Sequence, residues 1–200
     1  MTTYPVAAKQ LLRDTLLDAA DALLDERPWA KISMGEVARG AGVSRQTLYN
    51  EFGGRKEFAE ALLIREAERL LAGPEREIAA HPDDARAAIT GALRTFLEAA
   101  AHNRLVESMT SETDDGLLAL VTTQDAVVAA ATERLAAHIG RIWPDVDARD
   151  ARRLTETVVR LGISHAALPS GSPAQTARAI AAVIGPHLDE LVPSQSSRAA

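Results

Sequence analysis

The sequence has no cysteine and no long apolar run. Without cysteine, disulfide bonds and thiolate chemistry are excluded. No apolar run reaches the roughly 18 residues that a membrane-spanning helix needs, and residues 1–10 lack the apolar core of a secretion signal. We therefore expect a cytoplasmic protein without a membrane partner. The rest of the chain is rich in alanine and leucine with interspersed arginine and glutamate, a composition that favours helices.

The sequence also lacks the motifs of common catalytic and metal sites. It has no glycine-rich phosphate loop, no recognisable nucleophile motif and no His-Glu-x-x-His pair. Its five histidines are dispersed along the chain: His81, His102, His138, His165 and His187. We therefore expect no enzyme activity, no metal and no cofactor.

The distribution of charge is more informative than its sum. The net charge is −6, which by itself argues against a nucleic-acid partner. The segment 31–56, however, carries five cations against two carboxylates, a local charge of +3 that leaves −9 for all other residues. An acidic body with one basic end suits a protein that meets DNA through that end alone.

Two helix starts lie close together in this basic segment. Ser33, followed three residues later by Glu36, is a capping box that predicts the start of a helix. Gly42 lies in the break after that helix, where a tight turn demands a left-handed backbone. Ser44 predicts the next helix, and Gly53 ends it. Two short helices separated by about three residues form a helix-turn-helix.

The rest of the chain is predicted to be helical as well. We expect an all-α protein of about nine helices, with no strand-like alternation and no internal repeat. Residues 193–200 are small and polar, which predicts a disordered tail. Outside the helix-turn-helix, the predicted helices span residues 7–27, 55–79, 83–101, 103–110, 115–141, 147–168 and 173–191. The alternative for the helix over 55–79 is that Gly73-Pro74 ends or kinks it early.

The segment 32–58 resembles the DNA-binding signature of TetR-family regulators. The resemblance rests on Ser33-Met34, Val37-Ala38, the run from Ala41 to Ser44, and Leu48-Tyr49 with Phe52. The family usually has lysine where this chain has Arg55, and Asn50-Glu51 is a less usual pair. The run after Tyr49 is also similar to actinobacterial regulators associated with alkane and lipid metabolism.

This resemblance implies a DNA-binding domain over residues 1–54 and a ligand-binding and dimerisation domain over residues 55–192. In such a motif the second helix enters the major groove, where arginine can pair with guanine, glutamine with adenine and the threonine methyl with thymine. Glu51 would bring negative charge near DNA unless a neighbour such as Arg55 paired with it. The expected DNA contacts are Lys31, Ser33, Met34, Ser44, Arg45, Gln46, Thr47, Tyr49, Asn50, Arg55 and Lys56.

The resemblance also implies a homodimer and a small effector bound in the body. The two last helices have apolar faces that would form a four-helix interface in a dimer, and the alternative is that they pack on their own subunit. The expected interface residues are Leu154, Val158, Leu161, His165, Ile180, Ile184 and Leu188.

A long aliphatic effector, acyl or alkane-related, is favoured because aromatic residues make up only 4% of the chain. The alternative is that the apolar residues of the middle helices are all core. The expected ligand contacts are Phe96, Leu97, Leu105, Met109, Leu117, Val121, Val128 and Trp143.

The function expected from these patterns is a repressor that leaves a pseudo-palindromic operator when its effector binds. An activator fits the same sequence, and so does a helical interaction protein that has lost DNA binding. The sequence identifies neither the operator nor the effector.

Overall fold

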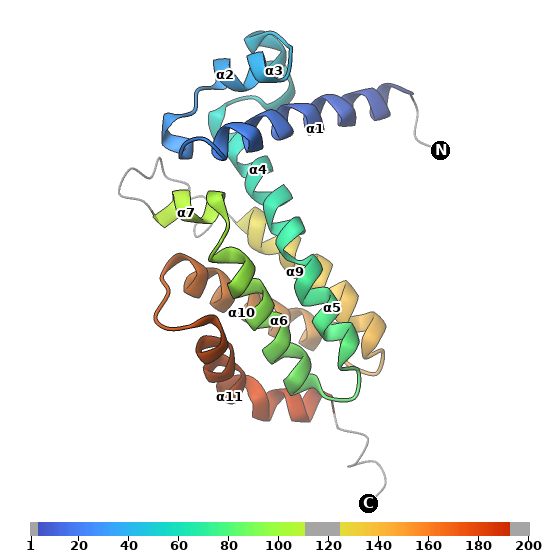
Figure 1. Cartoon of the computed structure of the whole chain (residues 1–200). Coiled ribbons are helices and arrows are strands. Elements are labelled where there is room, and N and C mark those ends of the chain that lie inside the picture. The colour runs from blue at the N-terminus through green and yellow to red at the C-terminus, as the bar shows by residue number, and fades with distance from the viewer. Residues whose placement is uncertain (1–3, 111–124, 193–200) are drawn as a thin grey trace, which may run out of the picture.

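The computed structural model describes residues 4–110 and 125–192, and all regular structure in these ranges is helical (Figure 1). The N-terminal helices form a head, which we define as residues 4–58. The helix α4 leaves the head and runs into a larger body. The elements of this part are α1 (Tyr4–Leu24), the 3-10 turn η1 (Trp29–Lys31), α2 (Met34–Gly40), α3 (Arg45–Phe52) and α4 (Arg55–Leu70).

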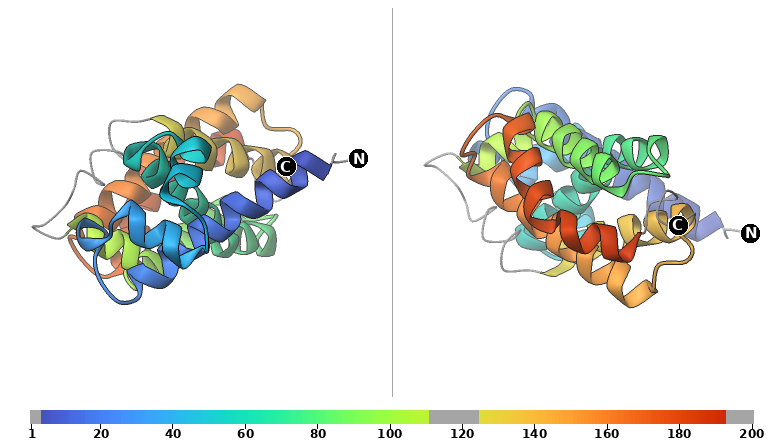
Figure 2. Two further views of the ribbon diagram at one scale, coloured as in Figure 1. Left: turned by 90° about the horizontal axis from the view of Figure 1, so that it is seen from above. Right: turned by 90° about the horizontal axis from the view of Figure 1, so that it is seen from below.

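The body is a helical bundle in which helices distant in sequence lie side by side. Figure 2 shows α11 lying alongside α6, and these two helices share extensive contacts. The helices of the body are α5 (Ala72–Ala80), α6 (Ala85–Ala100), α7 (Arg104–Thr110), α9 (Asp125–Ile142), α10 (Ala148–Ala167) and α11 (Pro173–Leu191). None of the helices described is long and apolar enough to span a membrane.

The predicted all-α fold is confirmed, and some helix boundaries are corrected. The first helix, expected over residues 7–27, is Tyr4–Leu24. The single helix expected over residues 55–79 is two, because Leu71 ends α4 and α5 follows it directly. The first part of the helix expected over residues 115–141 lies outside the described residues. The tail predicted for residues 193–200 also lies outside them.

The core of the head is built on aromatic rings. Trp29 and Phe58 stack with ring centroids 6.1 Å apart, and Phe52 meets Phe58 edge-on at 4.7 Å. Leu48 and Val37 are fully buried beside them, as expected for residues that fix the angle between the two short helices. Because α3 supplies Leu48 and Phe52 to this core, its orientation on the head is set by packing.

Part of the predicted dimer interface is instead the core of the subunit. Leu154, Ile180 and Leu188 are buried in one cluster with Ile89 and Leu93 of α6. Leu188 has no exposed surface at all. The apolar stripe of α11 therefore packs on α6 of its own chain, and the interface prediction is wrong for these three residues.

Candidate nucleic-acid interface and apolar cavity

The start of α2 is held by the capping box that the sequence predicts. The Glu36 amide donates to Ser33 Oγ at 3.3 Å, and the Ser33 amide donates to Glu36 Oε2 at 2.9 Å. The Ser33 hydroxyl also donates to Glu36 Oε2, at 2.7 Å, and this bond lowers the pKa of the Glu36 carboxyl below its ordinary value. Glu36 is therefore ionised and committed to the helix end near neutral pH.

The turn between α2 and α3 depends on one glycine and one serine. Gly42 has φ of +68°, a left-handed conformation that a residue with a Cβ rarely adopts. Ser44 follows it as the N-cap of α3, and its Oγ accepts from the Thr47 amide at 3.0 Å. The chain therefore reverses and starts α3 within a few residues, as a helix-turn-helix requires.

One face of α3 is polar and exposed. Arg45, Gln46 and Asn50 are exposed, whereas Leu48 and Phe52 are buried on the opposite side. Arg45 Nη2 donates to the Tyr49 hydroxyl at 3.2 Å, and Gln46 Nε2 donates to Asn50 Oδ1 at 2.8 Å. These side chains form a row along the outer face of the helix. Amide, guanidinium and phenol groups in such a row can hydrogen-bond base edges and phosphates.

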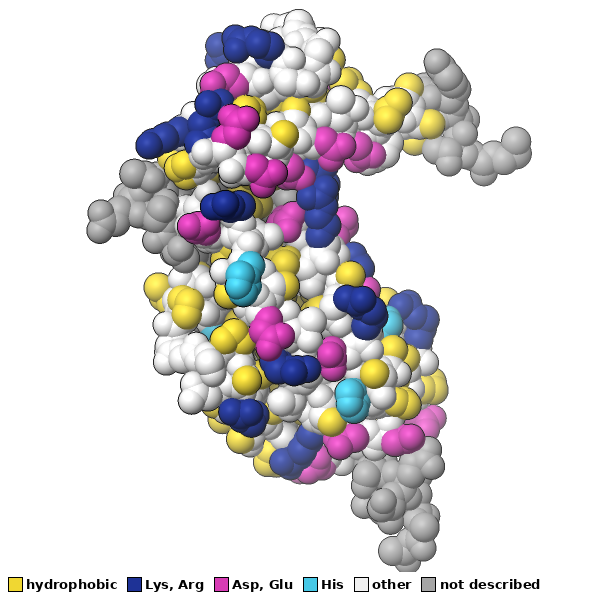
Figure 3. Space-filling view, viewed as in Figure 1, with side chains coloured by type: hydrophobic (Ala, Val, Ile, Leu, Met, Phe, Trp, Pro, Cys, Tyr) yellow, Lys and Arg dark blue, Asp and Glu magenta, His cyan; other side chains and the backbone are white. Residues whose placement is uncertain are grey.

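Both carboxylates of the basic segment form ion pairs with cations from other parts of the chain. Glu51 pairs with Arg13 of α1 at 3.0 Å and with Lys9 at 3.7 Å, and its side chain is only 10% exposed. Glu36 pairs with Arg27 at 2.8 Å. The partner of Glu51 is therefore Arg13 rather than Arg55, and both carboxylates are neutralised by cations outside the segment. Charges of both signs are spread over the face of the molecule in Figure 3.

Two of the expected DNA contacts have structural roles instead. The Met34 side chain is 4% exposed and belongs to the core of the head, so the prediction is wrong for that side chain. Arg55 lies over the Trp29 ring at 4.4 Å and donates to the carbonyl oxygens of Trp29 and Ile32. Its guanidinium thus ties α4 to the turn η1.

The other residues expected at DNA lie at the surface of the head. Ser33, Ser44, Lys31 and Lys56 are exposed, while Thr47 and Tyr49 are half-buried. Arg39, near the end of α2, is also exposed and adds a cation to this surface, although it is not one of the expected contacts. Its position on the polar side of a short helix was the signal that could have found it.

An apolar cavity of about 100 Å³ lies in the body. Phe96 and Leu105, two of the residues predicted to contact a ligand, line it. Among the residues described, its lining is Leu63, Glu66, Ala67, Leu70, Leu71, Pro74, Ala92, Leu93, Phe96, Leu105, Val106, Val127, Ala131, Leu135, Val158, Val159, Gly162, Ile163, Ala166 and Ala167.

Three expected ligand contacts are core residues rather than cavity residues. Leu97, Val128 and Trp143 are buried away from the lining. Trp143 Nε1 donates to the Pro82 carbonyl at 2.6 Å, which holds the ring at the far end of α9. Leu117, Val121 and the Met109 side chain lie outside the described residues.

Residues of α4 and α10 also line the cavity, and they are not among the predicted ligand contacts. Leu63 and Glu66 come from α4, and Gly162 comes from α10. Val158, expected at the dimer interface, also lines the cavity. Which face of these helices meets the cavity depends on how the bundle assembles, and their helical periodicity alone carries no signal for it.

The outer face of the last two helices exposes two large apolar residues. Val183 of α11 is 81% exposed and Leu168, just after α10, is 72% exposed. Leu161, Ile184 and His165 are partly buried.

Two family models match this chain. Residues 16–62 match the model of bacterial regulatory proteins of the tetR family. Residues 84–186 match the model of the bacterial tetracyclin repressor C-terminal domain. The first match spans the turn with Gly42 and all of α3, and the second spans α6 to most of α11.

The chain is similar over nearly its whole length to one curated regulator. The HTH-type transcriptional regulator AlkX of Mycobacterium tuberculosis is 35% identical over 185 residues, which are 92% of this chain and 88% of that regulator. The similarity thus includes both the head and the body.

Solved structures share the same arrangement of helices. The TetR family repressor AlkX from Dietzia sp. strain DQ12-45-1b, implicated in biodegradation of n-alkanes, superposes with a TM-score of 0.81 at 32% identity, covering 90% of this chain and 96% of the other. RolR in complex with the ligand resorcinol gives a TM-score of 0.66 at 17% identity, covering 96% and 93%. At that identity the likeness to RolR concerns the fold alone.

Proposed function

Since the chain belongs to the TetR family of bacterial transcriptional regulators, we propose that it is a repressor whose homodimer leaves its operator when an apolar effector binds. The head would bind DNA, the cavity would bind the effector, and α4 would connect them. An activator would bind DNA through the same interface but would raise transcription instead of lowering it. The description of the Dietzia relative as a repressor favours repression.

The exposed row on α3 is the observation that carries the DNA-binding proposal. Arg45, Gln46 and Asn50 point outward from a helix whose opposite face is fixed in the core. The carboxylates of Glu36 and Glu51 are paired away from that row. A helix with this width and chemistry fits the major groove.

Fluorescence anisotropy with labelled DNA tests this proposal. The target is the duplex upstream of the protein's own gene, and the control is a shuffled duplex of the same length and composition. We expect the target to bind at least about 1,000-fold more tightly than the control, as for specific regulators. Equal affinities for the two duplexes would contradict the proposal.

The proposed dimer uses the outer face of the last two helices. Val183 and Leu168 are the large exposed apolar residues there, with Leu161 and Ile184 partly buried beside the core. A second copy of this chain would cover them through a twofold axis, which also places two α3 helices on two half-sites. In sedimentation velocity we expect a dimer for the wild type and a monomer for Val183→Asp. A Val183→Asp variant that stays dimeric would contradict this interface.

The effector proposal rests on the chemistry of the cavity. Its lining is almost entirely aliphatic, with Phe96 as its single ring among the residues described. A long aliphatic molecule, acyl or alkane-related, suits such a lining better than a flat aromatic drug. The association of the Dietzia relative with n-alkane biodegradation points in the same direction. Native mass spectrometry of the purified chain would recover aliphatic molecules, and recovery of only polar compounds would contradict the assignment.

A further inference from the structure

Glu66 is the one charged side chain in the cavity lining that the structure describes. It lies on α4, the helix that joins the head to the body. The other lining residues described are apolar or glycine. A carboxylate at an apolar cavity costs free energy unless hydrogen bonds compensate its desolvation. Glu66 therefore needs hydrogen-bond partners at the edge of the cavity.

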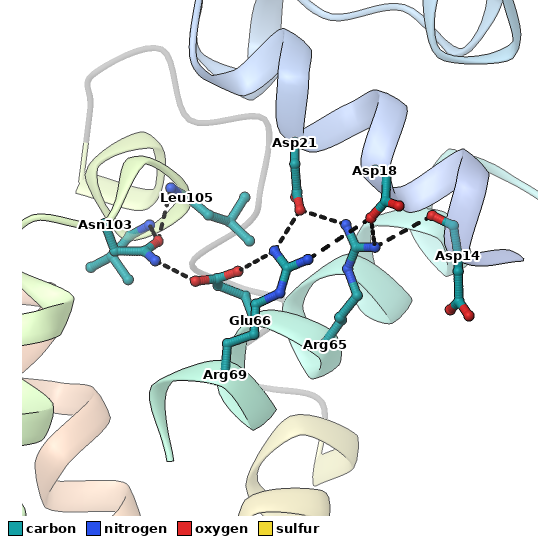
Figure 4. A network of polar contacts seen from close by, with 9 residues as sticks. Asp14, Asp18, Asp21, Arg65, Glu66, Arg69, Asn103 and Leu105 are labelled. Carbon is teal, nitrogen blue, oxygen red and sulfur yellow. Dashed lines mark hydrogen bonds and ion pairs between the residues drawn. The ribbon is translucent and has the colours of Figure 1, made fainter. Parts of the chain in front are cut away.

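Both oxygens of Glu66 have partners, and these lead to different parts of the chain (Figure 4). Oε1 accepts from Asn103 Nδ2 at 2.5 Å, and Oε2 lies 3.3 Å from Arg69 Nη1. Asn103 precedes α7, and Arg69 lies one turn further along α4. A change in the position of the Glu66 carboxylate would thus alter its contacts with both Asn103 and Arg69.

The first direction runs through Arg69 to α1 of the head. Arg69 Nη1 donates to Asp21 Oδ2 at 2.5 Å, and the same carboxylate accepts from Arg65 Nη2 at 2.6 Å. The bond to Asp21 raises the pKa of the Arg69 guanidinium, so this guanidinium stays protonated. In Figure 3 dark blue and magenta side chains lie together where the head meets the body. Ion pairs therefore join α1 of the head to α4.

The second direction runs through Asn103 to the turn η1. Asn103 Oδ1 accepts from the amides of Leu105 and Val106 at 3.0 and 3.1 Å, and so caps α7. One turn later, Ser108 Oγ accepts from the buried Trp29 amide of the head at 3.4 Å. Leu105 and Val106 line the cavity. The start of α7 is therefore tied to the cavity, to Glu66 and to the head.

We propose that Glu66 hydrogen-bonds the effector, and that this contact changes the interactions by which α4 and α7 hold the head. A hydroxyl of an otherwise apolar, uncharged effector donates to Glu66 and displaces Asn103. The carboxylate then reorients, and both the cap of α7 and the Arg69–Asp21 tie weaken. This inference rests on the proposed effector function and names the chemistry of that same site.

Two observations support an uncharged donor rather than an anion. The described lining contains no cation, so the carboxylate of a fatty acid would lie beside Glu66 without a counter-charge in the lining. The cavity holds about 100 Å³, whereas ligand sites usually occupy about 300 Å³ or more. A long effector must therefore move the helices around it, and Glu66 lies on one of those helices.

The first test needs neither DNA nor effector. We expect amide hydrogen exchange of Glu66→Gln to be about fivefold faster at the start of α7 and in the C-terminal half of α1. The matched control is Asp25→Asn, an exposed carboxylate just beyond α1, which should exchange like the wild type. Acceleration confined to α4 would overturn the relay, whether or not the chain binds DNA.

The second test measures release of the upstream duplex by three probes of equal chain length. We expect 1-dodecanol to weaken wild-type binding about tenfold or more, and dodecane and dodecanoate to weaken it less than threefold. For Glu66→Gln, affinity without probe should fall, because the ties to α7 and α1 are already loosened, and dodecanol should weaken the remaining binding no further. Asn103→Asp keeps an oxygen to cap α7 but loses the donor to Glu66, so it should bind DNA weakly without any probe.

Three outcomes would overturn the proposal. They are equal release of the wild type by dodecanoate and dodecanol, no release by any probe, and an unchanged dodecanol effect in Glu66→Gln. If the wild type does not bind the upstream duplex at all, the proposed function is contradicted instead. The hydrogen-exchange measurement would then still show whether Glu66 is coupled to α7 and α1.

Discussion

The head and the body are packed in different ways. The head closes on the rings of Trp29, Phe52 and Phe58, which contact one another directly. The body packs mainly aliphatic side chains and leaves a cavity between its helices. Interlocked rings hold α3 in one orientation, whereas aliphatic packing around free space can rearrange at smaller cost. The difference suits a rigid DNA reader on a deformable sensor.

The largest effect should come from removing a ring in the head. Phe58 is fully buried, so Phe58→Ala should lower the free energy of unfolding by about 4 kcal/mol. Leu63→Ala, at the edge of the cavity, should cost less, about 2 kcal/mol. Urea unfolding at one fixed protomer concentration measures both. A larger cost for Leu63→Ala would contradict the contrast between head and body.

The next effect concerns DNA binding more than stability. Replacing both Arg45 and Tyr49 by alanine removes two adjacent groups of the exposed row, which should weaken binding to the upstream duplex roughly 100-fold. The unfolding free energy should fall by only about 1 kcal/mol, because Arg45 is exposed and Tyr49 is only partly buried against the core. Arg178→Ala, an exposed arginine of the body, is the matched control. Unchanged affinity in the double variant would exclude α3 as the DNA reader.

How far the sequence predicts the structure also differs between head and body. In the head the signals are local: Ser33 and Ser44 cap their helices, and Gly42 takes the left-handed turn. Such signals depend on residues three or four positions apart. The pairing of Glu51 with Arg13 joins segments 38 positions apart, and no local pattern predicts it.

In the body the sequence predicts helices but not what they pack against. The apolar stripe of α11 fits a partner subunit and α6 of the same chain equally well. Leu188 of α11 packs in one cluster with residues of α6, whereas Val183 of the same helix faces outward. Likewise the sequence does not show whether Trp143 lies in the core or at the cavity. Its place is seen only from the hydrogen bond that its Nε1 donates to the Pro82 carbonyl. Burial against a specific neighbour is a tertiary property.

Gly162 of α10 lines the cavity, and a larger side chain there would fill part of its free space. A Cβ added at Gly162 would lie 3.3 Å from Phe96 Cε1, and that ring borders the cavity, so it has room to shift. Gly162→Ala should therefore stabilise α10 by up to about 1 kcal/mol while weakening the binding of 1-dodecanol. Thermal unfolding and probe titration measure the two effects. Destabilisation with unchanged probe binding would show that Gly162 has no role at the cavity.

The smallest effect is a pH dependence within the body. Arg134 of α9 donates to both Glu75 oxygens of α5 at 2.7 and 2.8 Å, which lowers the pKa of Glu75 below its usual 4.5. A lowered pKa in the fold stabilises it above pH 4.5, and this contribution disappears as the pH falls through the folded-state pKa. Because Arg134 is more than a third exposed, Glu75→Gln should cost only about 0.5 kcal/mol at pH 7.

Urea unfolding of the wild type and Glu75→Gln between pH 3 and pH 7 checks this dependence. The two curves should converge on the acid side of pH 4.5 and run parallel above it. Thr157→Val, which changes an exposed side chain of α10, should leave a difference from the wild type that does not vary with pH. A gap for Glu75→Gln that widens toward acid would contradict the role of the Arg134 pair.

Hydroxyl-radical footprinting on the upstream duplex tests the central claim most directly, that two copies of the head read DNA through α3. The account predicts two protected patches whose centres lie about 10 base pairs, or a multiple of that, apart on one face of the duplex. Both patches should disappear together in the Arg45 and Tyr49 double variant. A single patch, or protection that survives in that variant, would contradict it.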